Sequence, residues 1–205
     1  MSKTKRNKKA KPNRLGRLQA SAELSIHSVE TLRLWNAHSK KGNNVGVGLF
    51  FKNVSTLEYA ARQDDPYADF ALLEIEQKMN EAFALCHEGM ATLPSLTSSR
   101  VQFSEAISAV PIVKTLSLFS RFGWRLVALL EQFDVLMVRL SDAYFKAQIS
   151  RQSYEALRRR LIQAVRAVLQ QSIVRRHSGI TRQDVAANNA KAAQAQEKHG
   201  AIPFE

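Results

Sequence analysis

The side chains of this sequence best suited to bind a partner are basic, and they form two groups. Residues 1–17 carry eight Lys and Arg side chains and no acid, and residues 151–177 carry seven arginines against Glu155. Residues 18–150 have twelve basic and fourteen acidic side chains, so the middle of the chain is nearly neutral. Closely spaced ammonium and guanidinium groups displace counterions from a phosphate backbone. The net charge of +12 therefore predicts an anionic partner, either nucleic acid or a membrane surface.

The first basic group lies in a stretch without hydrophobic periodicity, so residues 1–16 are predicted to form a disordered arm. Such an arm contacts phosphates without distinguishing one DNA sequence from another. The alternative is a tail that only keeps the protein soluble. We expect the arm and a predicted turn at residues 40–44 to contact DNA through basic side chains: Lys8, Lys9, Lys11, Arg14, Lys40 and Lys41.

The second basic group lies on a predicted helix. Apolar residues from Tyr154 to Val168 recur at steps of three and four, and this spacing is typical of one buried helix face. Arg159 and Arg166 lie on the opposite face, together with Gln163 and Gln170. An arginine face is often only solvated, but Glu155 is the single acid in this region. Both interpretations stay open, and Arg159 and Arg166 are candidate DNA contacts.

A strand near the N-terminus is the candidate for sequence-specific contacts. Apolar and polar residues alternate over 17–27, which predicts a β-strand, and Ser28 is placed to cap a short helix over 29–39. A second helix is predicted near 50–61. One strand followed by two helices is the order of a ribbon-helix-helix module, in which two protomers pair their strands into a ribbon that enters the major groove. The side chains facing the bases would then include Arg17, Gln19, Ser21 and Ser25.

Two alternatives to this ribbon stay open. The strand over 17–27 can be an ordinary edge strand in a mixed sheet. Residues 113–118 also form a predicted strand followed by two helices, so they fit the ribbon equally well. Glu23 and His27 suit a DNA-facing strand less well, because a carboxylate is repelled by phosphates unless it accepts from cytosine.

The remaining pattern predicts a helix-dominated α+β fold. Longer helices are expected from Pro66 to Met90 and over 122–145, and the latter pairs with the arginine helix through a turn near residues 149–150. Short strands are expected around 101–103 and 112–118, with Pro111 between them, and Gly179 suits a helix stop. We expect a dimer with a ribbon-helix-helix-like topology and additional helices, because a lone strand leaves backbone groups unpaired. The predicted organisation is an arm at 1–16, a DNA-binding and dimerisation domain at 17–178, and a C-terminal helical tail at 179–205.

Motifs typical of enzymes are missing from the sequence. Gly46 and Gly48 begin like a dinucleotide-binding loop, but Phe51 stands where its third glycine belongs. The five histidines are scattered, and Asp64 and Asp65 precede a proline, as residues that cap a helix do. A single cysteine excludes an internal disulfide, and charged residues interrupt the apolar stretch over 122–145. We therefore expect a cytoplasmic protein that is not an enzyme, has no cofactor and does not span a membrane.

Three stretches resemble one known family. They are Ala-Ala-Arg-Gln-Asp-Asp-Pro-Tyr-Ala-Asp at 60–69, Leu-Leu-Glu-Gln-Phe-Asp at 129–134 and Gly-Ile-Thr-Arg-Gln-Asp at 179–184, followed by Asn188 or Asn189. The chain is similar, from about Ser21 to Ala193, to the AcaB family of transcriptional regulators carried by conjugative plasmids and integrating conjugative elements. The resemblance implies a sequence-specific DNA-binding protein with a ribbon-helix-helix-like topology. The residue expectations above come from charge and strand pattern and not from the family.

The expected function is regulation of conjugative transfer genes, as an activator, by a homodimer that binds double-stranded DNA and meets the transcription machinery. One alternative is a non-catalytic accessory protein of the conjugation machinery that binds other proteins through its basic arm. A second alternative is an RNA-binding protein, because Lys-rich arms also occur on RNA binders.

Overall fold

The computed structural model describes residues 20–37, 45–94, 104 and 106–201. The elements of this part of the chain follow the order β1 (Ala20–Ile26), α1 (Val29–Trp35), α2 (Val47–Ala61), α3 (Pro66–Thr92), β2 (Ile112–Leu118), α4 (Arg121–Phe145), α5 (Arg151–Val174), α6 (Arg182–Ala186) and α7 (Ala190–His199). The expected helix-dominated α+β fold class is confirmed.

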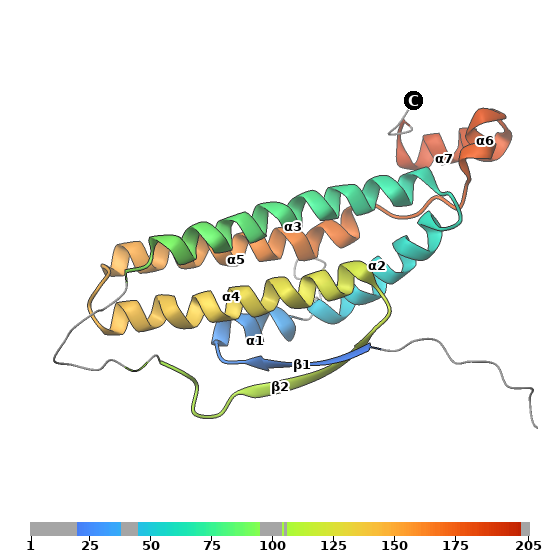
Figure 1. Cartoon of the computed structure of the whole chain (residues 1–205). Helices are drawn as coiled ribbons and strands as arrows, with labels where there is room; N and C mark the ends of the chain where they lie inside the picture. Colours follow the sequence, from blue (N-terminus) through green and yellow to red (C-terminus); the bar gives the residue numbers. More distant parts are fainter. Residues whose placement is uncertain (1–19, 38–44, 95–103, 105, 202–205) are drawn as a thin grey trace, which may run out of the picture.

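Helices α2 to α5 form the body of the protein, and α3 lies along α5 (Figure 1). The apolar stripe predicted on α4 is buried completely at Leu126, Leu130 and Phe133. The stripe on α5 is buried in the same way at Leu161 and Val165. Because burial of one such side chain contributes roughly 1.5–3 kcal/mol, these stripes contribute strongly to the stability of the body.

Side-chain caps define where most of these helices begin. Ser120 caps α4 and Ser150 caps α5, each by accepting a backbone N–H of the first turn. Helix α2 instead begins at Gly46, where a Cβ would lie 2.1 Å from the carbonyl oxygen of Ala37. Only glycine therefore allows α1 and α2 to approach this closely.

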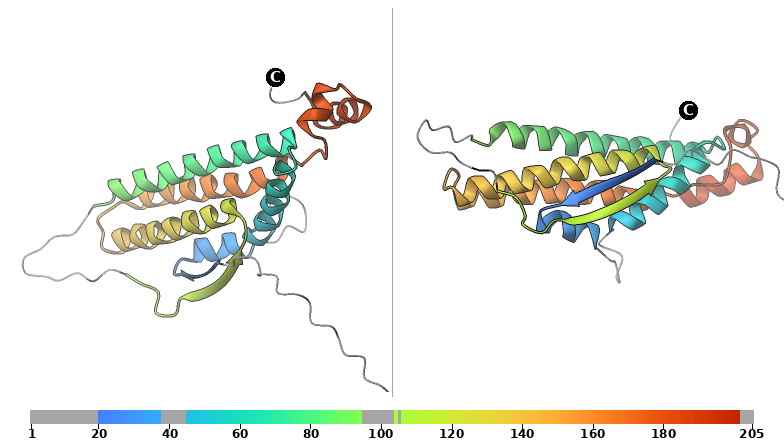
Figure 2. Two further views of the ribbon diagram at one scale, coloured as in Figure 1. Left: turned by 45° about the vertical axis from the view of Figure 1, so that its right-hand side comes forward. Right: turned by 60° about the horizontal axis from the view of Figure 1, so that its bottom comes forward.

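Strands β1 and β2 pair antiparallel, with Ala20 opposite Leu118 and Ile26 opposite Ile112. The two-stranded sheet lies across one side of the helical body, over α1 and α4 (Figure 2). Successive side chains of a strand point to opposite faces, and Leu24, Ile26 and Leu116 are buried on the face that meets the helices.

We expected β1 to be a lone strand that pairs with a strand of a second protomer, and this expectation is wrong. Its partner is β2 of the same chain, so an intramolecular strand supplies the hydrogen bonds that a dimer was expected to supply. The two strands that fitted a ribbon equally well by sequence are therefore not alternatives, because they form one ribbon together.

The corner between β1 and α1 is held by a carboxylate from α4. Asp134 is only 3% exposed, and it accepts hydrogen bonds from the backbone N–H groups of His27 and Ser28 at 2.8 and 2.9 Å. The hydroxyl of Ser28 also donates to Asp134, at 2.6 Å. A side chain more than a hundred residues away thus ties the first strand and helix to the body.

A second buried carboxylate joins the C-terminal segment to the start of α3. Asp65 is 2% exposed and caps α3 by accepting from Tyr67 N and Ala68 N, as the Asp-Asp-Pro pattern predicted. The same carboxylate accepts from the backbone N–H groups of Ser178 and Gly179, both at 2.7 Å. It therefore fixes the path of the chain between α5 and α6.

Arg182 reinforces this junction from the other side. It donates to Asp64 at 2.6 Å and to Asp69 at 2.7 Å. These hydrogen bonds raise the pKa of the Arg182 guanidinium above its ordinary value, and the bond to Asp64 has the larger effect. The resemblance motifs at 60–69 and 179–184 thus meet in space.

Three element boundaries differ from those predicted. Helix α1 ends at Trp35, before residue 39, and α5 ends at Val174 rather than continuing to Gly179, which lies in the following turn with φ of +77°. The C-terminal segment contains two helices, because Asn188 has a φ of +45° and Asn189 caps a new helix. The strand expected around 101–103 lies outside the described residues.

Replacement of Asp134 by Asn tests the corner between β1 and α1. The amide keeps the size of the side chain but loses one acceptor, which leaves a buried donor without a partner. We expect a loss of about 2–3 kcal/mol in the free energy of unfolding, measured by urea denaturation. The control is Glu131→Gln, an exposed position on the same helix that we expect to change stability by less than about 0.5 kcal/mol. Equal stability of both variants would show that the carboxylate does not hold the corner.

The single cysteine gives an independent test of the core. Cys86 on α3 is 4% exposed, and burial raises the pKa of its thiol to about 11. Since the thiolate is the reactive form, we expect Cys86 to react with an aromatic disulfide reagent at pH 8 only after the protein unfolds. Rapid reaction of the native protein would contradict the packing of α3 against its neighbours.

Candidate nucleic-acid interface

The face of the β1–β2 ribbon that points away from the helices is the candidate interface. The register places Ser21 opposite Ser117 and Glu23 opposite Thr115, and these four residues are exposed. Ser25 lies opposite Val113 on the same face. We call these six residues the outer face: Ser21, Glu23, Ser25, Val113, Thr115 and Ser117. Four of the six side chains are those of Ser or Thr, whose hydroxyl groups both donate and accept hydrogen bonds.

The two strands lead into the body in the same way. In each, two residues separate the strand from the first helix, and the second of them is a serine that caps the helix: Ser28 for α1 and Ser120 for α4. A second helix follows each first one, namely α2 and α5. The chain therefore contains two strand–helix–helix units, joined through their strands into one antiparallel ribbon.

A carboxylate lies beside each of the two helix starts next to the ribbon. Asp134 accepts at the corner before α1, and Glu58 on α2 accepts from Ser120 Oγ and Phe122 N at the start of α4, each at 3.1 Å. A helix N-terminus binds a phosphate through free N–H groups and its dipole, and these carboxylates compete for that role. Phosphate contacts near the ribbon are therefore expected from side chains rather than from these backbone amides.

The positive charge of β2 is directed away from the outer face. Lys114 lies on the inner face of the sheet, opposite Leu24, and its ammonium nitrogen is 5.9 Å from the centroid of the Trp35 ring. Glu23 is consequently the one charged residue among the six of the outer face. An inward-pointing lysine also discourages pairing of further strands with β2.

The other predicted contacts are distributed as follows. Ser21 and Ser25 lie exposed on the outer face, as expected. Arg159 and Arg166 are exposed on α5, but they line a cleft against α1 together with Arg33, and not the ribbon. Eight predicted contacts lie outside the described residues: Lys8, Lys9, Lys11, Arg14, Arg17, Gln19, Lys40 and Lys41.

Several residues of these sites were not predicted as contacts, among them Thr115, Ser117 and Arg33. Thr115 and Ser117 were detectable from the alternation over 112–118, once that strand is placed in the ribbon. Arg33 carries no comparable signal, because it lies on a short helix and its place beside α5 depends on the packing of the whole body.

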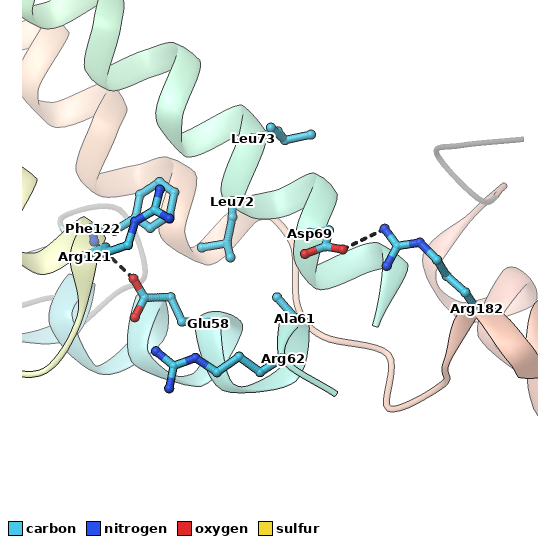
Figure 3. A pocket seen from close by; sticks show the side chains of 9 residues that line it. All are labelled: Glu58, Ala61, Arg62, Asp69, Leu72, Leu73, Arg121, Phe122 and Arg182. Carbon is cyan, nitrogen blue, oxygen red and sulfur yellow. Dashed lines mark hydrogen bonds and ion pairs between the residues drawn. The ribbon is translucent and has the colours of Figure 1, made fainter. Parts of the chain in front are cut away.

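A hollow of about 480 Å³ lies beside the start of α4, between α2, α3 and α6. Figure 3 shows Glu58 reaching the start of α4 on one side of this hollow, and Asp69 paired with Arg182 on the other. Both carboxylates thus hold elements together rather than standing free. The hollow is lined by Glu58, Ala61, Arg62, Asp69, Leu72, Leu73, Arg121, Phe122 and Arg182.

Within the described ranges, no group of three or more His, Cys, Asp and Glu residues is arranged to hold a metal ion. Over the same ranges, no helix combines the length and apolar character needed to cross a membrane.

The fold and site define a helical protein that presents a two-stranded antiparallel ribbon with a polar outer face. The chain belongs to the family of the transcriptional regulator AcaB, whose sequence model matches residues 14–205. The resemblance found in the three sequence motifs is thereby confirmed. Comparison with curated proteins gave no match.

A solved structure shares this fold. The crystal structure of selenomethionine-containing AcaB from uropathogenic E. coli superimposes with a TM-score of 0.64, over 92% of this chain and 94% of that chain. The two sequences are 12% identical, so the likeness shows a common fold.

Removal of the Glu58 carboxylate tests its role at the start of α4. Glu58→Ala takes away the acceptor for Ser120 Oγ and Phe122 N, and we expect the free energy of unfolding to fall by about 1–2 kcal/mol. Ser55→Ala, an exposed position on the same helix, is the control and is expected to change stability little. If urea denaturation shows no difference between them, the start of α4 does not depend on Glu58.

Proposed function

We propose that this protein is a cytoplasmic, non-enzymatic regulator that binds double-stranded DNA sequence-specifically and activates conjugative transfer genes. The observation that carries the proposal is the outer face of the β1–β2 ribbon. Membership of a family of transcriptional regulators supports a DNA partner. The role in conjugation is what the family resemblance implies, and activation is part of the proposal.

The shape and chemistry of the ribbon suit the major groove. That groove admits a two-stranded β-ribbon, and its base edges present donors, acceptors and the thymine methyl group. Seven residues on each strand are paired, so the outer face is continuous over both strands. Ser21, Thr115 and Ser117 offer hydroxyls to base edges, and Val113 offers an apolar contact for a thymine methyl group.

Charge and selectivity have separate sources in this proposal. The outer face carries a single charge, the carboxylate of Glu23, which is suited to accept from the amino group of cytosine. The eight basic residues of 1–17 precede β1 in the sequence. They would supply the sequence-independent attraction to phosphates, and the ribbon would supply the choice of site.

The second protomer has a different role from the one first expected. The ribbon is complete within one chain, so dimerisation is not needed to form it. A homodimer would instead place two ribbons on two half-sites about one helical turn apart. Contact with the transcription machinery would then fall to surfaces of the helical body.

Selection of duplexes from a randomised pool at about 0.2 M salt tests the proposal, because binding through counterion release alone is strongly weakened there. We expect recovery of a defined motif, and competition by structured RNA of equal charge should be weak. Failure to enrich any sequence would leave the accessory protein of the conjugation machinery as the better explanation, and preference for RNA would favour the RNA binder.

Two double variants with equal chemistry separate the ribbon from the rest of the surface. Ser21→Ala/Thr115→Ala removes two hydroxyls of the outer face, and we expect it to cost about 1–3 kcal/mol in binding to the selected duplex. Ser55→Ala/Thr56→Ala removes the same two residue types from exposed positions on α2 and should leave affinity unchanged. Fluorescence anisotropy gives both values, and equal affinity of the two variants would contradict recognition by the ribbon.

A further inference from the structure

A cleft between α1 and α5 gathers arginines from segments far apart in the sequence. Its volume is about 260 Å³, and its polar lining consists of Glu30, Arg33, Arg158, Arg159, Gln163 and Arg166. Four guanidinium groups thus face a cavity that contains one carboxylate. We call it the arginine cleft.

Arg158 has a structural role in this cleft. Its Nε donates to Glu30 at 2.9 Å, and both side chains are largely covered, with 22% and 13% exposed. The hydrogen bond to Glu30 raises the pKa of the Arg158 guanidinium, and Glu155 approaches it at 3.4 Å. This ion pair joins α5 to α1 and uses the one carboxylate of the lining.

The other three arginines keep their charge available. Arg159 is 74% exposed, and its distance to Glu155 is 4.0 Å, so that ion pair is weak. Arg33 and Arg166 are exposed, and within the described part of the chain neither forms an ion pair with a carboxylate. Like charges held at one cavity repel one another, and a bound anion with several oxygens would relieve the repulsion.

The donors match one class of ligand. Guanidinium groups present N–H forks that fit phosphate oxygens in pairs, and Gln163 adds an exposed amide beside them. The volume of the cleft accommodates phosphate groups. Its walls come from α1 and α5, so it does not include the outer face of the ribbon.

The geometry points to the arginine cleft as a phosphate-binding site separate from the ribbon, with Arg33, Arg159 and Arg166 as its ligands and Arg158 as the residue that positions its walls. The phosphates come either from a small polyphosphate or from the backbone of a nucleic acid. This site goes beyond the ribbon, since binding of free phosphates does not depend on recognition of a DNA sequence.

Isothermal titration calorimetry with tripolyphosphate in low salt is the first arm of the test. Arg33→Gln/Arg166→Gln removes two charges from the cleft, and we expect saturable binding to weaken by about tenfold or more. Arg62→Gln/Arg160→Gln removes two charges from exposed positions outside the cleft and should stay within about twofold of the unchanged protein. Thermal melting confirms that both variants are folded.

The second arm uses a duplex of random sequence, titrated over a range of salt. If backbone phosphates occupy the cleft, the negative slope of log K against log salt becomes shallower by about 0.9 for each phosphate that the cleft variant no longer neutralises. In the control variant the slope stays unchanged. If the cleft variant differs from the control only in tripolyphosphate binding, the site binds free polyphosphate. If the two variants differ only in the salt dependence of duplex binding, the site binds backbone phosphates. If cleft and control variants agree in both arms, the inference is overturned.

Neither arm uses the selected duplex, so these results are independent of the ribbon. Ser21→Ala/Thr115→Ala should bind tripolyphosphate as the unchanged protein does. If tripolyphosphate binding depends on the cleft arginines but the ribbon variant keeps its sequence selection, the ribbon proposal fails and the phosphate site stands. If the ribbon variant loses sequence selection but the cleft and control variants bind phosphate alike, the phosphate site fails and the ribbon proposal stands.

Discussion

The carboxylate of Asp134 is the interaction on which the position of the ribbon depends. Apolar contacts hold a sheet against helices without direction, and the inner face of two short strands offers few of them. Three hydrogen bonds from His27 and Ser28 to one buried carboxylate add the missing direction. Since Asp134 lies within the buried stripe of α4, the strand is anchored to a well-packed part of the body.

Glu58 performs the matching task at the other strand. It lies on α2, in the first strand–helix–helix unit, and it holds the start of α4 in the second. Asp134 lies in the second unit and holds the first. Each unit therefore supplies the carboxylate that orders the strand-to-helix corner of the other, and neither corner is complete without both halves of the chain.

Local periodicity was sufficient to predict the long helices and both strands. The stripe from Leu126 to Tyr144, the alternation before Ser28 and the position of Pro66 each report on neighbours within one turn or one strand. Pairing of β1 with β2 was beyond this reach, because the register joins residues about ninety positions apart and no local pattern names the partner.

Individual residues show the same limit. Lys114 looks like an outward residue by its charge, yet its long side chain reaches along the inner face to Trp35. Asp134 looks like an interruption of an apolar stripe, and its partners become evident only when the β1–α1 corner lies beside α4. The alternation did predict that Ser21 and Ser25 are exposed, whereas Arg33 beside Arg166 required the tertiary structure.

The two strands of the ribbon belong to one gene product and differ in sequence. In a ribbon shared by two identical chains, every substitution is introduced twice, at positions related by symmetry. Here Glu23 faces Thr115 and Ser25 faces Val113, so a substitution changes one position and leaves its counterpart alone. The two halves of the outer face are free to diverge independently in evolution.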